Sequence, residues 1–150
     1  MKAVFHTGIT VSDLDKSIEF YRDKLGLELT LGPTEVFEGD ALSAGLGVPN
    51  AKLRLAVFKV GHGEIELLQY LSPESPVERP VPSNTLGAMH VAFEVENMRQ
   101  KYEELKSKGI EFLSEPNVVT EGPLNGWTWV YFKDPDGITL ELIEYKPPVS

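Results

Sequence analysis

The chain has 150 residues, of which 41% are hydrophobic and 25% are charged, and its formal net charge is −9. This composition excludes a disordered or fibrous chain, and no apolar run approaches the roughly 18 residues of a membrane helix. No lysine or arginine cluster offers a basic face, so nucleic acid is not an expected partner. Because cysteine is absent, disulfides and thiolate metal sites are excluded. Together with a polar turn too early for a signal peptide, this favours a cytoplasmic location.

The first half of the chain predicts one helix followed by three strands, with a short strand before it. Residues 6–11 are rich in β-forming side chains, and apolar residues at helical spacing then predict a helix over 13–25. Ser12-Asp13 supplies its cap and Gly26 its end. Strands are expected at LELTL, LRLAVFKV and EIELLQY, and the piece at 38–51 between them is expected to be irregular.

The second half repeats the first. FHTGITVSDLDKSIEFYRDKLGLELT, from Phe5, aligns with MHVAFEVENMRQKYEELKSKGIEFLS, from Met89, once one extra residue is allowed in the first copy. His6 then falls over His90, and the later segments EIELLQY and ITLELIEY place Glu66 over Glu141. The second half therefore predicts a helix over 97–108 and strands at IEFLS, WTWVYFK and ITLELIEY, the last two joined by a DPDG turn.

The predicted fold class is α+β, with two βαβββ modules in tandem. We expect one domain over 1–150, made of module one at 1–70, a proline-rich linker at 71–88 and module two at 89–146.

Strand alternation points to a metal site. Side chains alternate between the two faces of a strand, which separates the apolar set Phe5, Ile9 and Val11 from His6. The same alternation separates Glu66, His90 and Glu141 from the apolar faces of their strands. Two neutral imidazoles and two carboxylates suit a divalent first-row metal: Zn, Ni, Co, Mn or Fe. Such an ion acidifies a carbon next to a coordinated carbonyl, and a displaced carboxylate can take the proton.

Other polar and aromatic residues are weaker candidates. His62 lies in a Gly-His-Gly turn, Glu64 and Glu144 are expected to be solvated, and Arg54 is an anion receptor or, more simply, a surface residue. One strand face carries alternating aromatic residues that form either a pocket wall or core, namely Trp127, Trp129 and Tyr131. Tyr70 and Tyr145 flank the site or pack at strand ends.

HTGITVSDLDKSIEFYRDKLGLEL, MHVAFEVENM and FKDPDGITLELIEY resemble the vicinal oxygen chelate superfamily. This superfamily of glyoxalases, bleomycin resistance proteins and dioxygenases includes glyoxalase I and methylmalonyl-CoA epimerase. The resemblance implies a cupped, barrel-like mixed sheet with helices outside, and metal ligands at His6, Glu66, His90 and Glu141. It also implies proton transfer by Glu141 or, second, by Glu66.

The expected function is that of a metal-dependent lyase or isomerase, similar to lactoylglutathione lyase or to an acyl-CoA epimerase. The alternatives are a non-heme iron extradiol-type dioxygenase and a non-enzymatic protein that binds a small molecule such as an antibiotic. The expected partners are a small-molecule substrate and a second copy in a homodimer, without nucleic acid or membrane. Whether one chain or two build each site is left open.

Overall fold

The computed structural model describes residues 1–77 and 81–145. The chain divides into two compact units, Met1–Glu78 (unit 1) and Arg79–Ser150 (unit 2). Their boundary falls within the expected linker, of which residues 78–80 lie outside the described residues, as does residue 146 at the end of module two. In the described part of the chain, no helix has the length and apolar character needed to cross a membrane.

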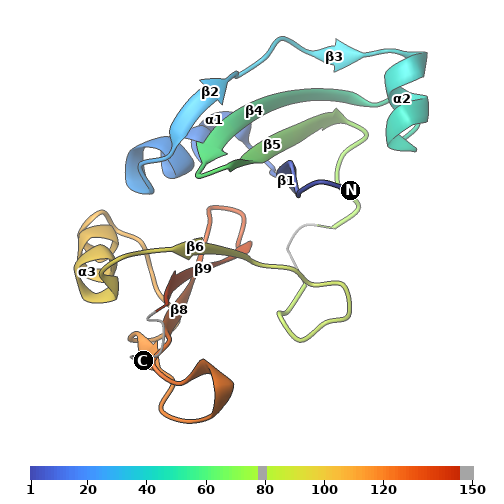
Figure 1. The fold of residues 1–150 in the computed structure, drawn as a ribbon. Helices are drawn as coiled ribbons and strands as arrows, with labels where there is room; N and C mark the ends of the chain where they lie inside the picture. The colour runs from blue at the N-terminus through green and yellow to red at the C-terminus, as the bar shows by residue number, and fades with distance from the viewer. Residues whose placement is uncertain (78–80, 146–150) are drawn as a thin grey trace. The chain divides into compact units, whose positions relative to one another are not determined.

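Unit 1 is a five-stranded sheet with helices (Figure 1). The sheet follows the order β1-β5-β4-β2, β3 also pairs with β4, and only the β1–β5 pair is parallel. The helix pair α1 and η1 packs its apolar face on the sheet, with Leu14 and Tyr21 fully buried. The elements are β1 (His6–Thr10), α1 (Leu14–Glu19), η1 (Phe20–Lys24), β2 (Glu28–Leu31), β3 (Phe37–Glu38), α2 (Asp40–Leu46), β4 (Lys52–Val60) and β5 (Gly63–Ser72).

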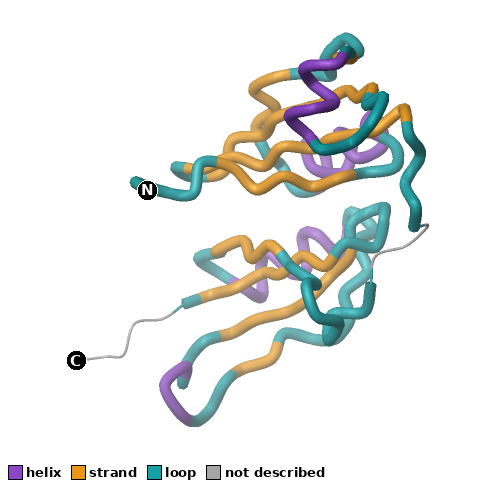
Figure 2. The backbone as a smooth tube through the Cα atoms, turned by 90° about the vertical axis from the view of Figure 1, so that its right-hand side faces the viewer, coloured by secondary structure: helices purple, strands orange, loops and turns teal. Residues whose placement is uncertain are grey.

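Unit 2 repeats this plan in a four-stranded sheet of order β6-β9-β8-β7, again with one parallel pair, β6–β9. Its helix buries Met98, Tyr102 and Leu105. Figure 2 traces the strands of each sheet side by side. The elements are β6 (Val91–Glu94), α3 (Met98–Ser107), β7 (Asn117–Val118), η2 (Gly122–Leu124), β8 (Thr128–Lys133) and β9 (Thr139–Glu144).

The α+β class and the two βαβββ modules are confirmed, with equivalent caps at both helix starts. The Asp13 carboxylate accepts a hydrogen bond from the Lys16 amide, and the Asn97 side chain accepts one from the Gln100 amide, each at 3.0 Å. Such a cap satisfies an amide that the helix itself leaves unpaired.

Three local expectations were wrong. Residues 38–51 are not wholly irregular, because they contain α2. The IEFLS segment forms only one bridge, Phe112 to Phe132, and the edge strand β7 lies further along the chain. Phe5 precedes β1 and is 73% exposed, whereas Ile9 and Val11 are buried as expected.

Candidate metal-binding pairs

In unit 1 the parallel strands β1 and β5 bring His6 and Glu66 together. Gly8 lies opposite Glu66 in the register, and His6 stands two residues before Gly8 on the same face. The His6 Nε2 lies 3.7 Å from the Glu66 Oε2. Gly8 carries no side chain, which leaves the space beside the Glu66 carboxylate open.

Unit 2 reproduces this arrangement. Ala92 lies opposite Glu141, and His90 stands two residues before Ala92, just ahead of β6. The His90 Nε2 lies 3.0 Å from the Glu141 Oε2. Each unit therefore brings its own histidine and glutamate together, and each pair has a small residue at the same register position.

The surroundings of the two pairs differ. The Glu66 side chain is 21% exposed and lies opposite Val57, whereas the Glu141 side chain is 10% exposed and lies opposite Tyr131. Burial raises the pKa of Glu141, and His90 opposes that shift. Burial, followed by the charge of Glu141, raises the pKa of Tyr131.

The donor spacing can be compared with that of two ligands on one first-row metal. Bonds of about 2.0–2.2 Å place adjacent donor atoms about 2.8–3.6 Å apart in octahedral or tetrahedral geometry. The His90–Glu141 separation falls inside this range, and the His6–Glu66 separation lies just beyond its upper end. Within the described part of either unit, no third His, Asp or Glu joins its pair to make a metal-binding cluster. That all four residues bind one ion stays a prediction.

The aromatic side chains of β8 border the His90–Glu141 pair. Tyr131 lies opposite Glu141, with its ring centroid 5.2 Å from that of His90 and 5.1 Å from that of Trp129. Trp127, just before β8, has its ring centroid 4.9 Å from that of Tyr145. The three residues of this row are only partly buried, which favours the interpretation as a wall of the site face over that as core.

Arg54 is not placed to receive a substrate anion. Its guanidinium contacts the Asp15 carboxylate at 3.4 Å and donates to the Thr34 carbonyl, and it alternates away from the Glu66 face. His62 lies in an exposed turn, as expected.

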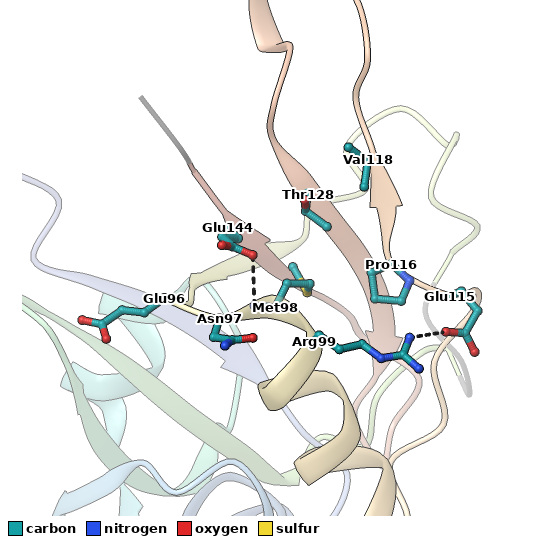
Figure 3. Close-up of a pocket in the computed structure, with 9 residues that line it drawn as sticks. All are labelled: Glu96, Asn97, Met98, Arg99, Glu115, Pro116, Val118, Thr128 and Glu144. Atoms are coloured by element: carbon teal, nitrogen blue, oxygen red, sulfur yellow. Dashed lines mark hydrogen bonds and ion pairs between the residues drawn. The ribbon is translucent and has the colours of Figure 1, made fainter. Parts of the chain in front are cut away.

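The expectation that Glu144 is a solvated neighbour was wrong. It is 9% exposed, and its carboxylate accepts a hydrogen bond of 3.0 Å from the Met98 amide at the start of α3 (Figure 3). The equivalent contact in unit 1 joins the Leu14 amide to the Gln69 side-chain oxygen at 3.2 Å. The correspondence of Gln69 and Glu144 in the repeat is the signal that would have revealed this role.

Glu144 also lines a cavity of unit 2. This cavity, of about 570 Å³, opens between the start of α3 and β8, with Thr128 and the Arg99–Glu115 ion pair among its lining residues (Figure 3). Three positions separate Glu144 from Glu141, so the two carboxylates lie on opposite faces of the sheet. The cavity therefore does not belong to the His90–Glu141 pair.

Comparison with known proteins agrees with this fold. The family model of the Glyoxalase/Bleomycin resistance protein/Dioxygenase superfamily matches residues 3–142. The chain belongs to this superfamily, as the sequence resemblance predicted.

Three similar proteins illustrate the relationship. A 2-epi-5-epi-valiolone epimerase from Actinomyces sp is 35% identical, with 94% of this chain and 78% of the epimerase covered. A lactoylglutathione lyase from Escherichia coli O157:H7 is 32% identical, with 95% and 93% covered. The crystal structure of a glyoxalase family protein from Bacillus cereus has a TM-score of 0.79 and 26% identity, with 98% and 96% covered.

Proposed function

We propose that the chain is a metal-dependent lyase or isomerase of the glyoxalase type, which shifts a proton next to a substrate carbonyl. The observation that carries this proposal is the repeated His–Glu pair, at the same register position in both units. A structural role for one such pair is unremarkable, but its repetition beside a glycine and an alanine points to a shared ligand.

His6, Glu66, His90 and Glu141 would hold the ion. Two neutral imidazoles and two carboxylates balance a divalent charge, and four protein ligands in an octahedral site leave two positions for substrate oxygens. When bound, a Zn, Ni, Co, Mn or Fe ion would acidify the carbon next to a coordinated carbonyl. The joint site of both pairs rests on the family resemblance and on this chemistry.

Glu141 is our first choice for proton transfer. It is more shielded from water than Glu66, and Tyr131 and His90 border it. Its carboxylate would take a proton from one carbon of the substrate and return it there or to the neighbouring atom. Return to the same carbon is an epimerase reaction, and return to its neighbour is the isomerisation in a lactoylglutathione-lyase-like reaction. The names of the relatives at 35% and 32% identity support both classes.

Elemental analysis followed by activity measurements tests the proposal. We expect metal-loaded protein to exchange deuterium from D₂O into the carbon next to the carbonyl of an α-hydroxyketone, and metal-free protein not to do so. Oxygen uptake with a catechol under iron loading, without deuterium exchange, would instead indicate the dioxygenase alternative. Stable small-molecule binding without stoichiometric metal would indicate the non-enzymatic alternative.

A further inference from the structure

A separate cavity of about 360 Å³ lies in unit 1, at the ends of the parallel strands β1 and β5. Thr10 and Val11 line it from β1 and the turn that follows, and Tyr70 lines it from β5. Val48 and the segment 73–76 complete its walls. The volume is that of a pocket for a small ligand.

The lining of this cavity combines apolar side chains with one negative charge. Val48, Pro73 and Pro76 present hydrocarbon, and the one charged side chain among the lining residues is Glu74. No lysine or arginine lines the cavity in the described part of the chain. An apolar, uncharged group would gain from burial here, whereas a phosphate or carboxylate would meet Glu74 without a countercharge.

The cavity adjoins the face that carries the His6–Glu66 pair. Thr10 and Gly8 lie on the same face of β1, and Tyr70 lies on the same face of β5 as Glu66. Gly8 is the residue opposite Glu66, and Thr10 lies two residues further along β1. Two residues of a strand span about 7 Å. A small molecule whose reacting end lies at Glu66 can therefore extend its other end into the cavity.

Part of the wall comes from the insertion that distinguishes the first half of the chain. Val48 lies in the loop that follows α2, and hydrogen bonds join both ends of this loop to Ser43 of the helix. The Val48 amide donates to the Ser43 carbonyl at 3.1 Å, and the Ala51 amide donates to the Ser43 hydroxyl at 3.0 Å. At the corresponding place unit 2 has only the short 3₁₀ helix η2, so the wall formed by α2 and its loop differs between the two units.

We propose that this cavity is a specificity pocket, which takes the apolar portion of an uncharged carbonyl substrate and rejects substrates with an anionic tail at that position. The assignment to a substrate rests on the proposed function, whereas the binding preference of the cavity does not.

Binding is tested without any activity. Cyclohexanol, titrated into the ¹⁵N-labelled full chain, should shift the amide signals of Val11, Ser12, Val48 and Ser75 to saturation. Cyclohexanecarboxylate should bind at least tenfold more weakly. Val48→Phe should weaken cyclohexanol binding at least tenfold, and the matched Leu46→Phe, on the exposed side of α2, should leave it unchanged.

The exposed Glu74 provides a second variant that does not disturb the core. Glu74→Lys should reverse the preference, so that cyclohexanecarboxylate binds more tightly than cyclohexanol. Shifts confined to other residues, or equal binding of both probes by the wild type and Glu74→Lys, would overturn the pocket assignment.

Exchange kinetics then connect the pocket with the reaction. In metal-loaded protein, Val48→Phe should raise KM at least tenfold for 1-cyclohexyl-2-hydroxyethanone and leave kcat/KM for hydroxyacetone unchanged. An equal loss with both ketones would contradict a specificity role. Wild-type protein that binds cyclohexanol in the cavity but exchanges neither ketone would overturn the proposed function and leave the binding site standing.

Discussion

At the scale of single residues, the two candidate ligand pairs are alike in register and unlike in surroundings. Val57 stands opposite Glu66 and Tyr131 stands opposite Glu141. The aromatic ring of Tyr131 borders the second pair, whose His–Glu separation is 3.0 Å, against 3.7 Å in the first pair. This difference supports the proposal that Glu141 transfers the proton and that Glu66 mainly binds the metal.

Glu141→Gln should separate metal binding from proton transfer. The amide oxygen still coordinates a metal, but the amide is no base at neutral pH, so the deuterium exchange rate should fall by about 10²–10⁴. Metal content, measured on the same samples, should fall only partly. Full exchange in a metal-replete variant would remove Glu141 as the base and shift that role to Glu66.

Glu144 should stabilise unit 2 through the Met98 amide. In Glu144→Ala that amide loses its acceptor in a buried position, so the free energy of unfolding should drop by about 1–3 kcal/mol. Glu144→Gln keeps an acceptor oxygen, as Gln69 does in unit 1, and should cost clearly less. Chemical denaturation measures both, and equal losses in the two variants would contradict the capping role.

Tyr102 should set the acidity of Glu115. Its hydroxyl donates to the Glu115 carboxylate at 3.0 Å and is the main cause of the lowered Glu115 pKa, ahead of Lys106 and Arg99. Tyr102→Phe should therefore raise this pKa toward the ordinary glutamate value. NMR titration of the Glu115 carboxyl carbon checks it, and an unchanged pKa would contradict the assignment.

The sign of the accompanying stability change follows from linkage. A carboxyl group whose folded-state pKa is lowered stabilises the protein above its unfolded pKa, and this contribution is lost as the pH falls through the folded pKa. The acid-induced loss of stability should therefore be smaller in Tyr102→Phe than in the wild type.

At the scale of elements, η1 explains the extra residue that the first copy of the repeat contains. The Leu25 amide donates to the Phe20 carbonyl, five residues back, which is the hydrogen bond of a π-helix. Between the buried Tyr21 and Gly26 there are four residues, whereas between the buried Leu105 and Gly109 there are three. The wider turn absorbs the insertion without moving the apolar face of the helix.

Deletion of Asp23 should convert this wide turn to the spacing of α3. Asp23 is exposed and lies after the last buried residue of η1, so the free energy of unfolding should change by less than about 2 kcal/mol. Deletion of Ser17, between Leu14 and Ile18, rotates the buried face and should prevent folding. Circular dichroism with denaturation compares the two, and comparable damage would contradict this interpretation.

The helices and most strands could be predicted because apolar periodicity reflects burial and capping residues mark helix starts. The α2 segment DALSAGL was not predicted as a helix, because none of its residues is buried and it has no apolar stripe. The IEFLS strand was overestimated because Phe112 packs on Tyr102 and Phe132 through its ring, which requires no ladder of backbone bonds. The capping role of Glu144 was not predicted, because strand alternation does not reveal which side chain meets a helix start.

At the scale of the whole molecule, the repeat in the sequence corresponds to two units with matching strand order and one parallel pair each. The internal repeat therefore predicted the fold class and gave each half one histidine and one glutamate at equivalent positions. It contains no information on how the two halves meet, because that depends on surfaces outside the repeated pattern. The cupped arrangement, the homodimer and the joint metal site stay predictions.

Metal stoichiometry tests the central claim most directly. Equilibrium dialysis of the wild type against Zn²⁺ or Co²⁺ should give one tightly bound ion per chain, whether one chain or two build each site. Because both pairs are proposed to hold the same ion, His6→Ala and His90→Ala should each weaken that one site, and excess metal should restore it in part. Two ions per chain in the wild type, with one lost in each variant, would show that the pairs bind separately and would contradict the joint site.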